Sequence, residues 1–355
     1  MKRIALIYDF EQWVLGNIAK QMASCLNGKI NYELVPTPFP KDRIELNQLQ
    51  RNHYALHFLT QRLFEWYPTQ LYRKSIVTTH HLGSKAKELF PRLLKHMDVP
   101  CVTNHDCLNT ICEITASKPT DFFHTPYGID TTFFSHRPNG RAIIQSRFPN
   151  LSPNSFLLGL AASPNSNEDE RKGFDRYWNL LRELNRAGLE RECHLIILGP
   201  SAETKNGWKP ELIPSDVAPF IHITGFVSRE DLPSFYCGLD YYLCLSRLEG
   251  GPYPVLECMS CGVPVISTWV GSVINLIEDG ISGWIVNEED HISKTLSIIS
   301  QNSFKEDLIR KARETLQKRH SFDSAYDPLL YNRIYATTPR NSLLRRLYRF
   351  TKTLR

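Results

Sequence analysis

Residues 246–267, SRLEGGPYPVLECMSCGVPVIS, decide how the chain is interpreted. In this stretch Glu249 stands beside two glycines, whereas Glu257 lies in an apolar run that ends in a second Gly-x-Pro. A strand is predicted to end just before the loop, and a helix is predicted to begin near Tyr253. Glycines let the backbone approach a ligand closely, and a helix N-terminus offers N–H groups and a positive dipole. The stretch therefore favours a site for a phosphate or a diphosphate.

The two glutamates predict a ligand with more than a phosphate. About one turn into the helix, Glu257 can accept hydrogen bonds from two neighbouring hydroxyls, as on a ribose. Glu249 would then face a different part of the same ligand. Ligands of open α/β sheets bind at the carboxyl ends of the strands, where this loop is expected. The favoured ligand is a nucleotide sugar, with one acid on either side of its diphosphate. The alternative is a capping carboxylate and a helix acid on a solvated face.

Short apolar strands and helices alternate along the rest of the chain. Strands are predicted at 3–8, 32–35, 54–59, 75–79, 99–103, 122–125, 156–161, 194–198, 221–224, 241–245 and 263–267, and helices at 14–26, 84–96, 173–188, 229–237 and 273–277. Such alternation is typical of parallel sheets covered on both faces. Residues 135–154 are rich in Pro, Asn, Ser and Arg, which predicts a domain boundary. We therefore expect two doubly wound, Rossmann-like α/β domains, 1–150 and 151–322, that face each other across a cleft.

Composition excludes several classes of protein. With 355 residues, 42% hydrophobic and 22% charged, the chain is typical of a globular protein of two domains. The nine cysteines are odd in number and show no tight spacing pattern, so reduced thiols are expected rather than disulfides. Cys258 and Cys261 form a CxxC pair, for which buried thiols are expected and a metal or redox site is the alternative. No signal-like or membrane-spanning segment is present, which predicts a cytoplasmic location. Without GxGxxG, P-loop, DxD or HExxH motifs, neither a cofactor nor a metal is expected.

Several motifs together resemble the retaining GT-B glycosyltransferases of the large family 4, or group 1, type. Within 246–267, eight residues fall on the pattern EGFG-x-P-x-x-E-A-M-A-x-G-x-P-V: Glu249, Gly250, Pro254, Glu257, Met259, Gly262, Pro264 and Val265. Further elements follow the family order, namely PYGIDTTFF at 126–134, Lys172-Gly173, ITGFVSREDLPSFY at 223–236 and IEDGISGWIV at 277–286. The resemblance covers most of residues 75–290.

The resemblance implies a set of site residues. It assigns the ribose to Glu257, the donor sugar to Glu249, and backbone contacts with sugar and diphosphate to Gly250 and Gly251. Lys172 would neutralise the leaving diphosphate, which makes Lys172, Glu249 and His80 the catalytic candidates. His80 of the segment TTHHL would lie beside the anomeric carbon, with His81 as a near rival. The remaining donor-binding candidates are Gly16 in the first loop, Arg171, and Phe226 and Val227 in the base-binding turn.

The sequence departs from the family pattern in three places. The arginine that usually follows the first strand of the second domain is missing, and no arginine occurs between that strand, 156–161, and Arg171. Gly-Gly-Pro replaces Gly-Phe-Gly after Glu249, and Ser272 stands where a second glycine is common. Either Arg171 takes over the phosphate contact, or Lys172 acts with little help.

The implied activity is metal-independent transfer of a sugar, with retention, from a nucleotide diphosphate sugar to a lipid-linked acceptor or surface-glycan precursor. Two alternatives remain open: an epimerase or hydrolase of GT-B fold, and a non-catalytic nucleotide-sugar-binding subunit. Residues 323–355 are expected to form a helix that returns to the first domain, followed by a basic tail. The tail, 340–355, could be an amphipathic helix on the inner face of an anionic membrane, or a solvated end. No nucleic-acid motif accompanies it.

Overall fold

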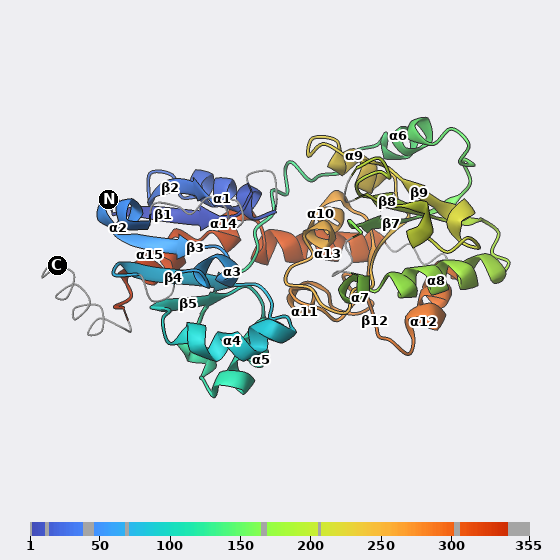
Figure 1. Ribbon diagram of the computed structural model, residues 1–355. Helices are drawn as coiled ribbons and strands as arrows, with labels where there is room; N and C mark the ends of the chain where they lie inside the picture. The colour runs from blue at the N-terminus through green and yellow to red at the C-terminus, as the bar shows by residue number, and fades with distance from the viewer. Residues whose placement is uncertain are drawn as a thin grey trace, which may run out of the picture. The chain divides into compact units, whose positions relative to one another are not determined.

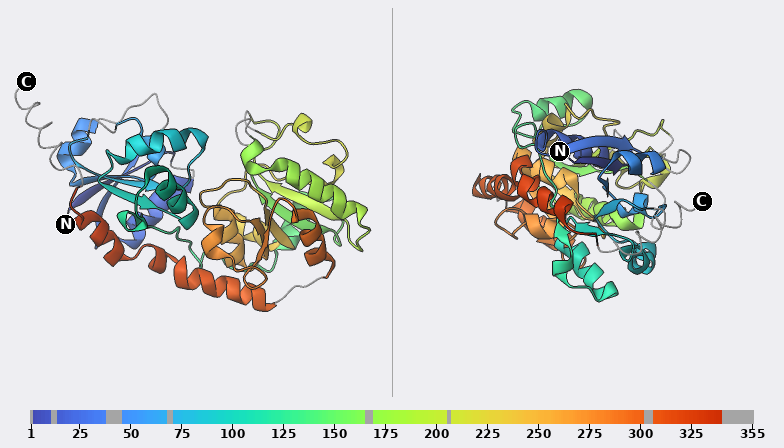
Figure 2. Two further views of the ribbon diagram at one scale, coloured as in Figure 1. Left: turned by 90° about the horizontal axis from the view of Figure 1, so that it is seen from below. Right: turned by 90° about the vertical axis from the view of Figure 1, so that its left-hand side faces the viewer.

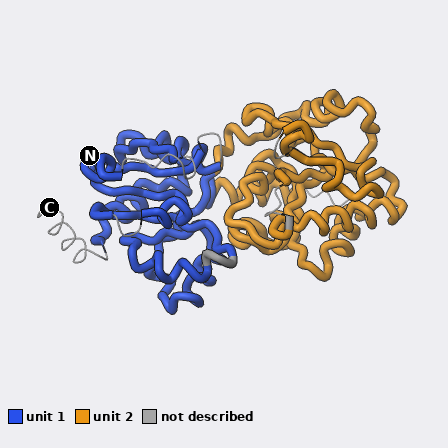
Figure 3. The backbone as a smooth tube through the Cα atoms, viewed as in Figure 1, with its two compact units in different colours: residues 1–128, 319–355 blue, residues 129–318 orange. Residues whose placement is uncertain are grey.

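The computed structural model describes residues 2–10, 14–37, 46–67, 71–164, 169–204, 207–301 and 306–339. The chain forms two compact units, shown in Figure 3: unit 1 comprises 1–128 with 319–355, and unit 2 comprises 129–318. The limits expected from sequence, 150/151 and 322/323, stay predictions about domains, and the two units are described separately below.

Unit 1 is built on a six-stranded parallel sheet with the order β2-β1-β3-β4-β5-β6. Its strands are β1 (Arg3–Tyr8), β2 (Asn31–Pro36), β3 (Ala55–Phe58), β4 (Lys74–Thr79), β5 (Val99–Val102) and β6 (Phe123–His124). The helices before residue 128 are α1 (Val14–Cys25), α2 (Leu46–Asn52), α3 (Gln61–Phe64), α4 (Ser84–Leu94) and α5 (His105–Thr115). They flank the sheet in Figure 1, which explains why β3 and β4 are buried along their whole length.

The last described helices differ from the single helix predicted within residues 323–355. After α13 (Glu306–Arg319) come two helices, α14 (Phe322–Ala325) and α15 (Pro328–Ala336), seen in Figure 2. The break occurs because Asp327 accepts a hydrogen bond from the Leu329 N–H, and Pro328 occupies the first helical position. An aspartate cap followed by proline starts a new helix rather than continuing an old one.

A buried lysine fastens α15 within unit 1. Lys74, at the start of β4, is 5% exposed, and its ammonium group donates to the carbonyl oxygens of Ile334 at 3.0 Å, Tyr335 at 2.8 Å and Thr337 at 2.5 Å. The Tyr335 hydroxyl also lies 2.8 Å from Nδ1 of buried His57. A cation at a helix C-terminus satisfies carbonyls that have no partner within the helix. These contacts hold the end of α15 against the sheet.

Unit 2 contains a second six-stranded parallel sheet, with the order β12-β11-β10-β7-β8-β9. Its strands are β7 (Phe156–Ala161), β8 (Cys193–Leu198), β9 (Ile221–Ile223), β10 (Tyr241–Cys244), β11 (Val265–Thr268) and β12 (Trp284–Val286). Its α-helices are α6 (Gly140–Arg147), α7 (Asp169–Lys172), α8 (Phe174–Arg186), α9 (Leu232–Cys237), α10 (Tyr253–Cys261), α11 (Val273–Leu276), α12 (His291–Ser300) and most of α13. Both α/β sheets confirm the predicted fold class.

The proline- and asparagine-rich stretch 135–154 is more ordered than its composition suggests. It contains α6, which packs against α9 where two glycines meet: a Cβ on Gly140 would lie 2.5 Å from the Gly238 backbone nitrogen. Only a chain without a side chain permits so close a backbone approach. The helix therefore depends on a tertiary contact that composition does not reveal.

Within the described ranges, no helix has the length and apolar character needed to span a bilayer. The predicted basic segment 340–355 lies outside the described residues.

Candidate functional site

The polar site of unit 2 lies at the point where its strand order reverses. From β7 the chain proceeds to β8 and β9 on one side, and then to β10, β11 and β12 on the other, so β7 and β10 are neighbours at the centre. Loops that leave the carboxyl ends of such strands diverge and form the binding crevice of an open α/β sheet. Here the segment after β7 carries Arg171 and Lys172, and the loop after β10 carries Glu249.

Glu249 is the centre of this site. Its side chain is 7% exposed, and its Oε1 accepts hydrogen bonds from Lys172 Nζ at 2.7 Å and Ser246 Oγ at 2.9 Å. Its Oε2 accepts one from Arg171 Nη1 at 3.0 Å, and the same Nη1 donates to the Leu248 carbonyl at 3.0 Å. Four sequence-predicted features, the two cations, the acid and the loop, thus meet in one place.

The two cations keep Glu249 ionised. Burial alone would raise the pKa of the Glu249 carboxyl, but the charges of Lys172 and Arg171 and the hydrogen bonds from Lys172 and Ser246 together lower it below 4.5. A carboxyl whose folded pKa is depressed stabilises the fold above the unfolded pKa, and this contribution is lost as the pH falls through the folded value. Two cations against one carboxylate leave an excess positive charge, which suits an anionic ligand.

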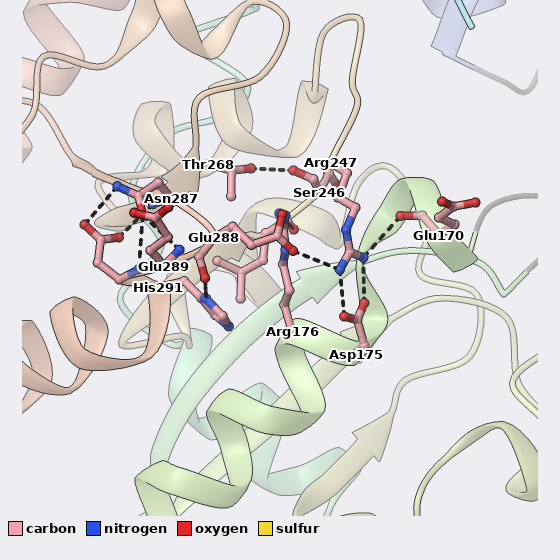
Figure 4. A network of polar contacts seen from close by, with 12 residues as sticks. Glu170, Asp175, Arg176, Ser246, Arg247, Thr268, Asn287, Glu288, Glu289 and His291 are labelled. Carbon is pink, nitrogen blue, oxygen red and sulfur yellow. Dashed lines mark hydrogen bonds and ion pairs between the residues drawn. The ribbon is translucent and has the colours of Figure 1, made fainter. Parts of the chain in front are cut away.

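Further ion pairs, drawn in Figure 4, hold the start of the same loop around Arg247. Arg247 binds both oxygens of Asp175 at 2.7 Å and reaches Glu288 Oε1 at 3.2 Å. Buried Arg176 contacts Glu288 Oε2 at 2.7 Å and donates to the Leu245 carbonyl at 3.1 Å. Asp175 and Arg176 belong to α8 and Glu288 to the segment before α12, so two other parts of unit 2 fix the backbone that leads to Glu249.

Close backbone contacts define the shape of the same loop. Gly271 has a φ of +50°, and a Cβ on it would lie 2.5 Å from the carbonyl oxygens of Glu249 and Gly250. Ser272 N donates to the Gly250 carbonyl at 3.1 Å, and Thr268 Oγ1 donates to the Ser246 carbonyl at 2.6 Å. The turn after β11 therefore lies alongside the Glu249 loop and leaves no space for a side chain at position 271.

We expect Gly271→Ala to disturb the site more than its matched control, Gly280→Ala. Both glycines have a positive φ, so each alanine costs about 1–2 kcal/mol in backbone strain. A Cβ on Gly280 meets no atom within 4 Å, whereas one on Gly271 meets two carbonyl oxygens. Urea unfolding should show about 1–3 kcal/mol of additional destabilisation for Gly271→Ala. Equal losses for the two variants would contradict the close contact.

Glu257 lies on α10, in the fifth position of the helix, and is half-buried. Its Oε2 accepts a hydrogen bond from the Tyr236 hydroxyl at 2.7 Å. Burial raises the pKa of Glu257 to about 7, although this hydrogen bond and the positive charge of Arg229 act in the opposite direction. The sequence pointed to Glu257 but gave no sign of Tyr236, which is 21 residues away along the chain.

Two exposed aromatic rings stand at the same edge of the sheet. Phe226, in the predicted base-binding turn after β9, is 90% exposed, and Val227 beside it is half-buried. Gly225, with a φ of +73°, allows the sharp turn that presents them. Trp269, directly after β11, is 53% exposed and was not expected from sequence. An exposed tryptophan next to a glycine-dependent turn is the signal that could have identified it.

The unit 1 candidates have a different environment. His80 is half-buried, and both of its ring nitrogens bind protein groups. Its Nε2 donates to the Leu59 carbonyl at 2.5 Å, and its Nδ1 contacts the Tyr127 hydroxyl. Burial lowers the pKa of His80 to about 4, so the ring is neutral at pH 7. His81 is half-buried, and its carbonyl accepts from Gln61. Gly16 is buried in the first turn of α1.

The structure thus brings Arg171, Lys172, Glu249 and the backbone of Gly250 together in unit 2, with Gly251 next in the chain. Glu257 follows on the helix that this loop enters. His80 and Gly16 belong to unit 1. Among the described residues there is no group of three or more His, Cys, Asp or Glu side chains with the geometry for a metal ion.

Residues 162–301 match the family model described as "Glycosyl transferases group 1". The chain carries a group 1 glycosyl transferase domain. The matched segment includes Lys172, Glu249 and Glu257, so the group 1 domain contains the cluster at the strand reversal.

Curated relatives match parts of the chain. One is the GDP-mannose-dependent alpha-(1-6)-phosphatidylinositol monomannoside mannosyltransferase of Mycolicibacterium smegmatis, 28% identical over 174 residues, which are 47% of this chain and 43% of that protein. Another is the alpha-D-kanosaminyltransferase of Streptomyces kanamyceticus, 32% identical over 120 residues, which are 32% of this chain and 29% of that protein. The matches span less than half the length of these relatives.

A solved structure matches both units. Anabaena HepE in complex with UDP-glucose aligns with a TM-score of 0.76 at 12% identity, covering 94% of this chain and 99% of HepE. At that identity the likeness establishes the fold alone. Together with the two parallel six-stranded sheets, it confirms the GT-B fold expected from the sequence.

Proposed function

We propose that this protein is a retaining, metal-independent glycosyltransferase that moves a sugar from a nucleotide diphosphate sugar to a glycan or lipid-linked acceptor. The observation that carries the proposal is the buried carboxylate Glu249 held between Lys172 and Arg171 at the strand reversal. The names of the relatives support it, because they describe transferases for mannosyl and kanosaminyl groups.

The contacts of the two cations suggest different roles. Nη1 of Arg171 donates to both Glu249 and the Leu248 carbonyl. The backbone carbonyl of Arg171 accepts hydrogen bonds from the backbone N–H groups of Arg247 and Leu248. It therefore serves as the anchor of the loop. Lys172 contacts the carboxylate through a compact ammonium with three donors, which can bind a phosphate while Glu249 holds it in place. We assign Lys172 to the diphosphate and Arg171 to the shape of the site.

Lys172 would act chiefly on the leaving group. As the bond between the sugar and the diphosphate breaks, negative charge grows on the phosphate oxygen. A fixed cation and the N-terminal end of α10 stabilise that charge without reorganisation. Glu249 would orient the donor sugar through its hydroxyls, and Glu257 would accept hydrogen bonds from the ribose. No metal is needed to supply positive charge in this arrangement, and His80 stays a prediction for the sugar side.

The proposal is tested by incubating the protein with UDP-, GDP- and ADP-sugars and octyl glycosides as acceptors, with and without EDTA. We expect release of nucleoside diphosphate that requires an acceptor, survives EDTA and yields a product whose proton NMR coupling shows the donor's anomeric configuration. Nucleotide release without acceptor would instead identify a hydrolase or epimerase. Loss of activity in EDTA with recovery in Mn²⁺ would overturn metal independence.

We also propose that the protein works in the cytoplasm and is attached to the membrane through 340–355. The segment contains Arg340, Arg345, Arg346, Arg349, Lys352 and Arg355 and no acidic residue. Each basic residue near an anionic surface contributes about 1 kcal/mol, and salt screens the effect.

Deleting 340–355 should release the protein from anionic liposomes without abolishing transfer to a soluble acceptor. Flotation of the full-length and truncated proteins at two salt concentrations, with neutral liposomes as control, measures this. Equal flotation of the two proteins would contradict a membrane role for the segment.

A further inference from the structure

The Glu257 carboxylate has two oxygens, and a protein group already binds one of them. Tyr236 on α9 is 1% exposed, and its hydroxyl donates to Glu257 Oε2 at 2.7 Å. Glu257 itself remains half-buried on α10. The hydrogen bond therefore joins a fully buried donor to an acid that is still accessible from outside.

The position of Tyr236 is closely fixed by its surroundings. Its ring packs edge-on against Tyr242 of β10, with centroids 6.2 Å apart and an interplanar angle of 89°. The end of α9 is pinned to α6, because Gly238 and Gly140 meet at a distance that excludes a Cβ on either residue. A hydroxyl on so constrained a ring holds the carboxylate in one orientation at little entropic cost.

We propose that Tyr236 is a positioning residue for the nucleotide: by holding one oxygen of Glu257, its hydroxyl directs the other toward the two ribose hydroxyls. The proposal rests on the proposed function, in which Glu257 accepts hydrogen bonds from the ribose. A carboxylate free to rotate would lose part of its binding energy in becoming ordered, whereas a held carboxylate does not.

The charges around Glu257 give the proposal a measurable signature. The cation that faces Glu257 is Arg229, in the turn before α9, whose guanidinium lies 4.1 Å from the centre of the Phe133 ring. The other titratable groups that interact with Glu257, or with the residues around it, include two phenols and four thiols: Tyr236, Tyr242, Cys237, Cys244, Cys258 and Cys261. Burial raises the pKa of the phenols and of Cys258, so these groups keep their protons at neutral pH, whereas the hydrogen bond with Cys261 lowers the pKa of Cys237.

Removing the Tyr236 hydroxyl should therefore change how nucleotide affinity depends on pH. Burial raises the pKa of Glu257 to about 7, and the Tyr236 hydrogen bond is the foremost group that opposes the rise. Without it the carboxyl holds its proton to a higher pH. Because a protonated carboxyl accepts fewer hydrogen bonds, the midpoint for loss of nucleotide binding should move upward in pH.

The test compares Tyr236→Phe with Tyr242→Phe, which makes the same chemical change on a buried neighbour whose hydroxyl accepts from Ala161 N at 3.2 Å. Calorimetry from pH 5.5 to 8.5 would measure binding of UDP, GDP and their 2′-deoxy forms, with urea unfolding to confirm that each variant folds. We expect wild type to bind the ribose nucleotide about tenfold more tightly than its 2′-deoxy form. In Tyr236→Phe this affinity ratio should fall about threefold, and the pH midpoint for loss of binding should rise. Tyr242→Phe should change neither the ratio nor the midpoint.

Two results separate the possible failures. If Glu257→Gln abolishes the ribose preference but Tyr236→Phe leaves both the preference and the midpoint as in wild type, the positioning role is overturned and the ribose assignment stands. If wild type and Glu257→Gln both bind the ribose and deoxy forms equally, the ribose assignment itself is wrong, and the role of Tyr236 is overturned with it.

Discussion

Replacing Lys172 by methionine is expected to lower kcat by about 10²–10³-fold, the usual effect of removing one fixed charge from a developing transition-state anion. Methionine keeps most of the apolar stem and removes the ammonium that lies 2.7 Å from Glu249 Oε1. Because Glu249 keeps Arg171 and Ser246 as partners, the free energy of unfolding should fall by only about 1–3 kcal/mol. Steady-state kinetics at saturating donor, together with urea unfolding, measure the two effects.

Arg171→Met is the matched comparison, because it removes the other cation from the same carboxylate. We expect a similar loss of stability but a smaller loss of kcat, since Arg171 is assigned to holding the loop. Lys294→Met, which breaks a surface ion pair with Asp279 elsewhere in unit 2, should leave both quantities nearly unchanged. If Arg171→Met were the slower enzyme, the two assignments would have to be exchanged.

The second large effect is expected in unit 1, on stability rather than on chemistry. Lys74→Met should lower the free energy of unfolding by about 3 kcal/mol or more, because three carbonyl groups at the end of α15 lose their donor together. Burial lowers the pKa of Lys74 to about 8, so at pH 7 the ammonium is still the main form and supplies all three protons. Loss of α15 docking would follow from this change.

Hydrogen exchange followed by mass spectrometry checks this prediction locally. Backbone amides of residues 329–336 should lose protection in Lys74→Met, while those of β8 in unit 2 should not. Lys87→Met, a change on α4 of the same unit, serves as the control and should leave α15 protected. Unchanged protection of α15 in Lys74→Met would show that apolar packing of Tyr331 and Ile334 suffices without the lysine.

The strands could be predicted from sequence because their apolar runs are short, buried and separated by turn residues. The elements that escaped prediction depend on contacts rather than on pattern. The helix α6 needs the Gly140–Gly238 contact, and β12 has only three residues. The helix α5 begins in a polar stretch and is secured by Asn104, whose side chain accepts from Cys107 N at 2.8 Å.

The site residues also divide into those that the sequence pattern indicates and those that depend on tertiary contacts. Glu249, Glu257 and Lys172 stood out because glycines and prolines surround the acids and a glycine follows the lysine. Sequence did not show that Arg171 lies beside Glu249, and the structure places its Nη1 3.0 Å from Oε2 of that carboxylate. Nor could it show that both ring nitrogens of His80 are engaged by Leu59 and Tyr127, since these partners come from other loops.

The most direct test of the central claim is calorimetric titration of the full-length protein with UDP, GDP and ADP, repeated with Lys172→Met and Lys294→Met. The account predicts that at least one nucleoside diphosphate binds wild type and Lys294→Met with equal affinity, and binds Lys172→Met at least tenfold more weakly. Failure of all three diphosphates to bind, or binding that Lys172→Met leaves unchanged, would contradict a diphosphate site beside Glu249.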